Sequence, residues 1–266
     1  MLMTNSRNNR PEPIGTGFII KRFDKTAIVV TATHNLTAIK GIQFGPAKHH
    51  PSALPEFIGK DQTLNLIRPN IYAISFRGEK TKSCQVLWAV SDERSDTAIL
   101  CLDCRDEPGF FDGEFLISER NPQVGDMVGL LGFGQTLETQ DSLTSADPNY
   151  YRMTTRVVLR VGKVSEVHPS GHLLCRGSCV STNIPVFPGM SGGPAIHFTS
   201  AGQGMEVFGL TCSDSALLDT ESRFNRLKPG RSTVALLDRQ VSIDASGSRS
   251  IAIRMQQALV HPTPQA

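Results

Sequence analysis

The pattern of short apolar runs is the feature that most restricts the fold of this chain. The runs are rich in β-branched residues and bounded by Gly, Pro, Asp and Asn, which predicts β-strands. The long helical patterns that would connect parallel strands are missing between them. The sequence therefore predicts an all-β protein, a sandwich or barrels, with strands over 16–22, 26–32, 71–76, 84–90, 96–102, 127–133, 156–167, 192–198, 205–212 and 232–237.

One helix is predicted, near the end of the chain. Ser248 is suited to be its N-cap, and Ile251, Met255 and Leu259 then recur at helical spacing and form an apolar stripe. A loop-rich stretch over 106–126 separates the two sets of strands. These features divide the chain into four parts. We expect a flexible N-terminal tail over 1–12, a first β-unit over 13–120, a second β-unit over 121–240, and a C-terminal helix with its tail over 241–266.

Composition excludes several classes of partner. Apolar residues make up 39% of the 266 residues and charged residues 20%, which is typical of soluble globular proteins. The net charge of +2 gives no electrostatic basis for binding nucleic acid. The polar start lacks the apolar core of a signal peptide, and no apolar stretch approaches the roughly 20 residues of a membrane helix. We therefore expect a cytoplasmic protein with neither nucleic acid nor membrane as a partner.

Six cysteines leave two interpretations open. Without an export signal, reduced thiols are the first expectation. The pairs Cys101/Cys104 and Cys175/Cys179 have the spacing of metal ligands, and together they could hold a zinc ion. However, Cys101 and Cys175 continue apolar runs, "AILCL" and "HLLC", as core residues of strands do. We therefore predict no metal site and keep the zinc-stabilised module as an alternative.

The stretch "PVFPGMSGGPAI" (185–196) places Ser191 among three glycines. "GMSGG" fits the G-x-S-x-G pattern of the nucleophile elbow of α/β-hydrolases, but that elbow leads directly into a helix. Here the strand-like run "GGPAIHF" follows the serine, which argues against an elbow. Upstream, "VVTATHN" ends a strand with His34, and "RSDTAILCL" opens another with Asp96. His34, Asp96 and Ser191 thus occur in the chain order described for chymotrypsin-type serine proteases.

At this point the sequence resembles trypsin/chymotrypsin-fold serine proteases, and most closely the bacterial HtrA-like kind without a PDZ domain. The matching segments, in family order, are "GTGFII", "TATHN", "DTAIL", "VGDMVGLLGFG", "PGMSGGPAI" and "VFGLTC". The resemblance implies two antiparallel six-stranded β-barrels, with His34 and Asp96 on the first and Ser191 on the second. It implies a serine endopeptidase that uses no cofactor and acts on a peptide or protein substrate.

The resemblance also assigns roles to individual residues. His34 would take the proton of the Ser191 hydroxyl, and Asp96 would orient the imidazole. The oxyanion hole would come from the loop Gly189, Met190 and Ser191, with the N–H groups of Gly189 and Ser191 as its donors. Compared with the family, Met190 replaces the usual Asp or Asn before the serine. No cysteine follows His34, where the secreted animal members carry one.

The substrate-binding residues follow from the same resemblance. One wall of the primary pocket would be formed by Pro185, Val186 and Phe187, and the other by Thr211, Cys212, Ser213 and Asp214. The backbone of Thr211 to Ser213 would pair with the substrate as an added strand. No carboxylate stands at the expected floor near Pro185, so we expect a preference for small or medium apolar residues, with Asp214 as the exception that could accept a basic one.

Two questions stay open from the sequence. A catalytically silent relative that binds peptides by strand addition would share all the motifs. An intracellular protease also needs restraint, and a regulatory partner that docks on 215–231 is one candidate for it.

Overall fold

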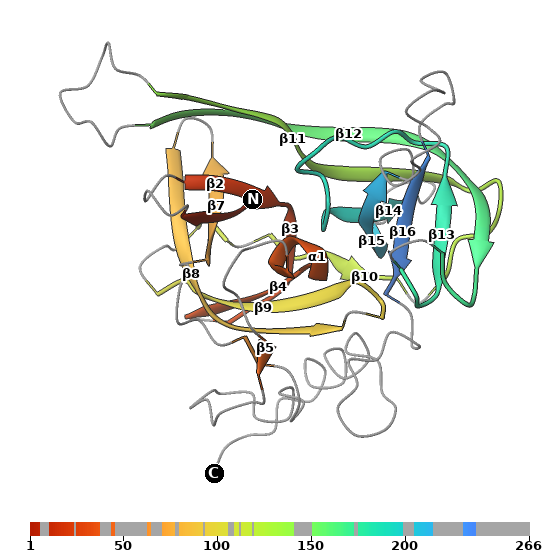
Figure 1. Cartoon of the computed structure of the whole chain (residues 1–266), viewed down its shortest axis with the longest axis horizontal. Helices are drawn as coiled ribbons and strands as arrows, with labels where there is room; N and C mark the ends of the chain where they lie inside the picture. The colour runs from red at the N-terminus through yellow and green to blue at the C-terminus, as the bar shows by residue number, and fades with distance from the viewer. Residues whose placement is uncertain are drawn as a thin grey trace.

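The chain folds into two β-sheets that pack against each other (Figure 1). The structure is a computed structural model. It describes residues 1–5, 11–23, 25–37, 44–45, 63–64, 71–77, 80–92, 94–105, 109–111, 113–118, 120–140, 151–172, 175–198, 205–214 and 231–237. All-β architecture is confirmed, and one short helix interrupts the strands of the described chain.

The first sheet contains the strands from the first part of the chain. It is antiparallel and runs in the order β2-β1-β7-β8-β9-β4-β3, with β5 and β6 joined to it through β8. Its strands are β1 (Leu2–Asn5), β2 (Pro11–Gly15), β3 (Gly17–Arg22), β4 (Thr26–Ala32), β5 (Phe44–Gly45), β6 (Thr63–Leu64), β7 (Ile71–Arg77), β8 (Lys80–Asp92) and β9 (Thr97–Asp103). The helix α1 (Thr33–Thr37) follows β4 directly.

The second sheet closes into a six-stranded barrel. Its strands follow one another in the order β15-β14-β11-β12-β13-β16, and a further pairing between β15 and β16 closes the ring. The short β10 adds to β15 as a parallel edge strand. The bounds are β10 (Leu116–Ile117), β11 (Met127–Gln140), β12 (Tyr151–His168), β13 (Cys179–Thr182), β14 (Pro194–His197), β15 (Glu206–Asp214) and β16 (Ser232–Leu236).

Three apolar cores hold this arrangement together. One fills the first sheet's own interior, around Leu100 and Leu102, and another fills the barrel, around Leu130 and Phe208. The third is shared, because it combines residues of β3, β4 and β9 with residues of β14, β15 and β16. Since burial of apolar surface is the main force that joins packed layers, this shared core fixes the position of the barrel on the first sheet.

The predicted strands are confirmed, and the chain forms more strands than the sequence indicated. The flexible tail predicted for 1–12 is wrong for Leu2–Asn5, which forms β1 between β2 and β7. Leu2 and Met3 are buried there. This strand, β2 and the short β5 and β6 bring the first sheet to nine strands instead of six. The C-terminal helix predicted from Ser248 lies outside the described residues.

Within the described residues, no helix has the length and apolar character needed to span a membrane.

Candidate active site

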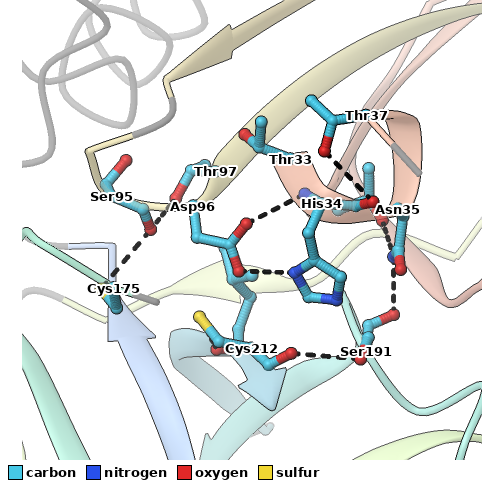
Figure 2. A network of polar contacts seen from close by, with 12 residues as sticks. Thr33, His34, Asn35, Thr37, Ser95, Asp96, Thr97, Cys175, Ser191 and Cys212 are labelled. Carbon is cyan, nitrogen blue, oxygen red and sulfur yellow. Dashed lines mark hydrogen bonds and ion pairs between the residues drawn. The ribbon is translucent and has the colours of Figure 1, made fainter. Parts of the chain in front are cut away.

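His34 is held by two contacts with one carboxylate. It lies in α1, and its imidazole Nδ1 is 2.8 Å from Oδ2 of Asp96. Its backbone N–H donates to Oδ1 of the same carboxylate, at 3.0 Å. Figure 2 shows the ring between Asp96 and Ser191, with its second nitrogen on the side away from the carboxylate. The two contacts fix both the position of the helix end and the direction of the ring.

Asp96 adopts a backbone conformation that few residues take up. Its φ is +54°, in the left-handed region, where Asp and Asn are enriched among non-glycine residues. Its carbonyl accepts the N–H of Thr33 at 2.9 Å, and its side chain is only 6% exposed. The register Ala32↔Thr97 between β4 and β9 brings the residue before β9 next to the start of α1. The fold therefore tolerates backbone strain at the position that orients the His34 ring.

Ser191 follows a tight turn that leads from β13 to β14. The N–H of Met190 donates to the carbonyl of Phe187 at 3.0 Å, with Pro188 and Gly189 between them. Gly189 has a φ of +95°. Proline at the second position, followed by glycine with positive φ, is the signature of a type II turn. This turn explains why the sequence requires Pro188 and Gly189 before the serine.

The turn changes one predicted role. Met190 was predicted as part of the oxyanion loop, but its N–H is used in the turn, so it cannot donate to an oxyanion. Its side chain is fully buried in the barrel core instead. In the described part of the chain, the N–H groups of Gly189 and Ser191 donate to no protein group. The site therefore has two free backbone donors, one on each side of Met190.

The hydroxyl of Ser191 donates to the carbonyl of Cys212, at 3.1 Å, instead of to the His34 imidazole (Figure 2). Hydrogen bonds between a nucleophile and its base are often long or misaligned in a protein without substrate. A rotation about the Cα–Cβ bond of Ser191 is the change that would turn the hydroxyl from Cys212 toward the ring.

The strand β15 contacts this loop through its backbone. Thr211 accepts the N–H of Gly192 at 2.7 Å, and its own N–H donates to Gly193 at 2.8 Å. Thr211 was predicted to pair with a substrate strand, but both of its backbone groups are already used. Ser213 and Asp214 belong to β15 and pair with β16 on one side. They remain the candidates for pairing with a substrate.

The predicted pocket wall lies directly before the turn. Val186 is buried in the barrel core, whereas Pro185 and Phe187 are half-buried. The guanidinium of Arg160 on β12 stacks over the Phe187 ring, 4.6 Å from its centroid. Three apolar residues thus lie next to the serine loop, and their role as the wall of a substrate pocket stays a prediction.

The six cysteines are free and buried. Cys101, Cys175, Cys179 and Cys212 lie in the shared core, whereas Cys104 belongs to the core of the first sheet. A hydrogen bond with Cys175 lowers the pKa of the Cys212 thiol. Burial and the Asp96 carboxylate raise it by more, so that the pKa lies above its usual value, at about 11. Among the described residues, no group of three or more His, Cys, Asp or Glu is placed to hold a metal ion.

Two residues near the serine were not identified from the sequence. Asn35 donates to the carbonyl of Ser191 at 2.9 Å, and the Thr16 hydroxyl donates to the carbonyl of Gly189 at 2.6 Å. Both stand in segments that carried the resemblance, "TATHN" and "GTGFII". Nothing in either segment indicates that its polar side chain reaches a loop more than 150 residues away.

No protein-family model matches the sequence, and no curated protein matches it significantly. Among solved structures, the active form of the Rv3671c protease from M. tuberculosis is similar at 15% identity, with a TM-score of 0.47, over 94% of this chain and 82% of that one. The HtrA-type protease AlgW with decapeptide is similar at 13% identity and a TM-score of 0.47, over 94% of this chain and 53% of that one.

The closed six-stranded barrel and the second sheet are consistent with a chymotrypsin-like all-β fold. In the chymotrypsin-like arrangement of this chain, His34 and Asp96 come from the first sheet and Ser191 from the barrel. The candidate site therefore lies where the two halves meet.

Proposed function

We propose that the protein is a serine endopeptidase in which Ser191 is the nucleophile, His34 the general base and Asp96 the residue that orients the base. The observation that carries this proposal is the position of the His34 ring, held at 2.8 Å by the buried Asp96 carboxylate on the side facing away from Ser191. Because Asp96 accepts at Nδ1, the proton of the neutral ring sits on that nitrogen, and the other nitrogen is left as a base.

The proposed reaction begins with attack of Ser191 on the scissile carbonyl. His34 takes the hydroxyl proton as the bond to the carbonyl carbon forms, and it later gives that proton to the leaving amine. The resulting acyl-enzyme is hydrolysed by water with the same base. Asp96 stabilises the imidazolium that forms.

The negative oxygen of the tetrahedral intermediate needs donors that are already oriented. The N–H groups of Gly189 and Ser191 are proposed for this role, because they are free of protein partners in the described chain. Such donors lower the barrier most when they require no reorganisation during the reaction. Glycine at 189 is required by its φ of +95°.

A serine-directed fluorophosphonate probe tests the proposal. We expect stoichiometric labelling of the native protein at Ser191, identified by peptide mass spectrometry, and none after unfolding, since only the assembled site activates the hydroxyl. Ser181 provides a matched control, because it is a buried serine on β13 that hydrogen-bonds His168 at 2.8 Å. A folded protein that takes up no probe would support the silent peptide-binding relative instead.

We further propose that the enzyme prefers a small or medium apolar residue before the scissile bond. The apolar wall Pro185, Val186 and Phe187 supports this, because buried apolar surface contributes about 25 cal/mol per Å². An unpaired buried cation would cost on the order of several kcal/mol. We expect a peptide-library profile with Val, Ala or Leu dominant. Dominant cleavage after Lys or Arg would contradict this preference and point to Asp214.

The proposed place of action is a reducing compartment such as the cytoplasm, which six free thiols support. The segment 215–231, considered above for a regulatory partner, lies outside the described residues except for Arg231.

A further inference from the structure

Two side chains of the first half hold the backbone of the serine loop. The amide of Asn35 donates to the carbonyl of Ser191 at 2.9 Å, and the hydroxyl of Thr16 donates to the carbonyl of Gly189 at 2.6 Å. Asn35 lies in α1 next to His34, and Thr16 lies between β2 and β3. Both are about 3% exposed, so water does not compete for these bonds. Figure 2 shows Asn35 directed at the Ser191 backbone.

These two bonds belong to a closed network. The N–H of Thr16 also donates to the Ser191 carbonyl, at 2.8 Å. The carbonyl of Thr16 accepts the hydroxyl of Thr31 at 2.7 Å, and that hydroxyl accepts from Asn35 at 3.1 Å. The hydroxyl of Thr16 in turn accepts the N–H of Phe133 on β11, at 2.9 Å. The hydroxyls of Thr16 and Thr31 and the amide nitrogen of Asn35 each have two partners in this buried ring, and such satisfied networks rigidify their surroundings.

The network determines which groups of the loop remain free. The carbonyl of Gly189 accepts from Thr16, that of Met190 from Gly193 at 2.9 Å, and that of Ser191 from Thr16 and Asn35. Three successive carbonyls are therefore turned into the protein. Because each peptide unit is planar and joins the carbonyl of one residue to the N–H of the next, the bonded Met190 carbonyl sets the direction of the free Ser191 N–H. The Gly189 N–H belongs to the preceding unit, and the bond from Thr16 to the Gly189 carbonyl holds the peptide unit that follows it.

Two glycines make room for the network. A Cβ on Gly15 would lie 2.3 Å from the Asn35 amide nitrogen. A Cβ on Gly192, where φ is +81°, would lie 2.3 Å from both the Thr16 carbonyl oxygen and the Thr31 hydroxyl. Such distances are far below van der Waals contact, so side chains at 15 and 192 would displace the donors. Gly15 in the first half and Gly192 in the second thus both leave space for the same hydrogen-bond network.

We propose that Thr16 and Asn35 are positioning residues that keep the oxyanion loop formed in the resting protein. This inference rests on the proposed function, since it concerns how the same site is kept ready. In this proposal, the hydrogen bonds of the uncharged side chains of Asn35 and Thr16 hold the Ser191 loop against the first half of the chain, which carries His34. The loop then needs no substrate or partner to acquire its active geometry.

Isosteric variants distinguish the loss of a hydrogen-bond donor from a change in side-chain volume. Thr16→Val and Asn35→Leu keep the volume but remove the donors, whereas Thr16→Ser keeps the hydroxyl. We expect Thr16→Val and Asn35→Leu each to lower kcat roughly 10- to 100-fold and to change KM by less than about threefold, because the oriented donors act on the transition state. Thr16→Ser should retain kcat within about threefold. The fluorophosphonate labelling rate should fall in parallel with kcat.

A purely structural role is distinguished by a control and by a direct measurement on the loop. Ser181→Ala removes one buried hydrogen bond of β13, away from the serine loop. It should lower the melting temperature to a similar extent and leave kcat unchanged. Amide hydrogen exchange at Met190 and Gly193, the turn donors of the loop, should become faster in Thr16→Val and Asn35→Leu, but not in Ser181→Ala.

The outcome separates this inference from the proposed function. Wild-type kcat in folded Thr16→Val and Asn35→Leu, together with loss of hydrolysis in Ser191→Ala, would overturn the positioning role and leave the protease intact. If one isosteric variant does not fold, the other decides, and a large kcat loss in Thr16→Ser would also contradict the inference. Faster exchange with reduced kcat and restored activity in Thr16→Ser supports it.

Discussion

Replacing Ser191 with alanine should abolish peptide hydrolysis, with a loss in kcat of about 10⁶-fold. The hydroxyl makes a single hydrogen bond in the resting site, to the carbonyl of Cys212, so its removal should cost little stability. The backbone of Ser191 keeps its contacts with Thr16 and Asn35, because these involve the carbonyl and not the side chain. Turnover of a fluorogenic peptide and the melting temperature measure the two effects separately.

The matched control for this variant is Ser181→Ala, which should keep full turnover. If Ser191→Ala hydrolyses peptides at a rate near that of the native protein, then Ser191 is not the nucleophile and the proposed function is wrong. A large drop in melting temperature in Ser191→Ala would also contradict the view that the hydroxyl contributes to chemistry far more than to packing.

Asp96→Asn should lower kcat by about 10⁴-fold, because an amide presents a donor where the carboxylate accepts from His34. The Asp96 carboxylate accepts both the ring Nδ1–H and the backbone N–H of His34, and an asparagine oxygen can serve only one of them well. The ring would then be favoured in the tautomer that leaves no base toward Ser191. Asparagine tolerates the positive φ at this position, so the fold should persist.

Asp103→Asn provides the comparison for this loss. Asp103 lies at the other end of β9 and pairs with Arg105 at the surface, away from His34. It should have native kcat and KM. Comparable losses in both variants would indicate that carboxylates of β9 act through stability alone. Activity in Asp96→Asn within a factor of ten of the native protein would mean that the contact with His34 does not orient the base.

The sequence predicted those parts of the fold that are encoded locally. The strand β4 was predicted with its observed bounds, because its run of apolar and β-branched residues and its flanking polar residues are properties of a few neighbouring positions. The order of His34, Asp96 and Ser191 was likewise visible, since each stands at the end or the start of an apolar run. The glycines around Ser191 were visible as well, and one of them, Gly189, has a φ of +95°.

What the sequence could not predict depends on contacts between distant segments. The strand β1 pairs with β7, about seventy residues later in the chain. Because this partner is distant in the sequence, the polar N-terminal segment was interpreted as a tail. The turn that uses the Met190 N–H is different, because the pair Pro188–Gly189 is a local signature of it in the sequence. Asn35 and Thr16 are ordinary polar residues in strand-end segments until the barrel brings the Ser191 loop between them.

The shared core between the two sheets has a consequence for how this protein can lose activity. The groups proposed for proton transfer stand on one side of that core and the nucleophile on the other, joined by Cys175, Cys179, Cys212 and their apolar neighbours. A small sliding of one half against the other would separate base and nucleophile while each half kept its own interior intact. We therefore expect that a shift at the shared core would inactivate the protein before either half unfolds.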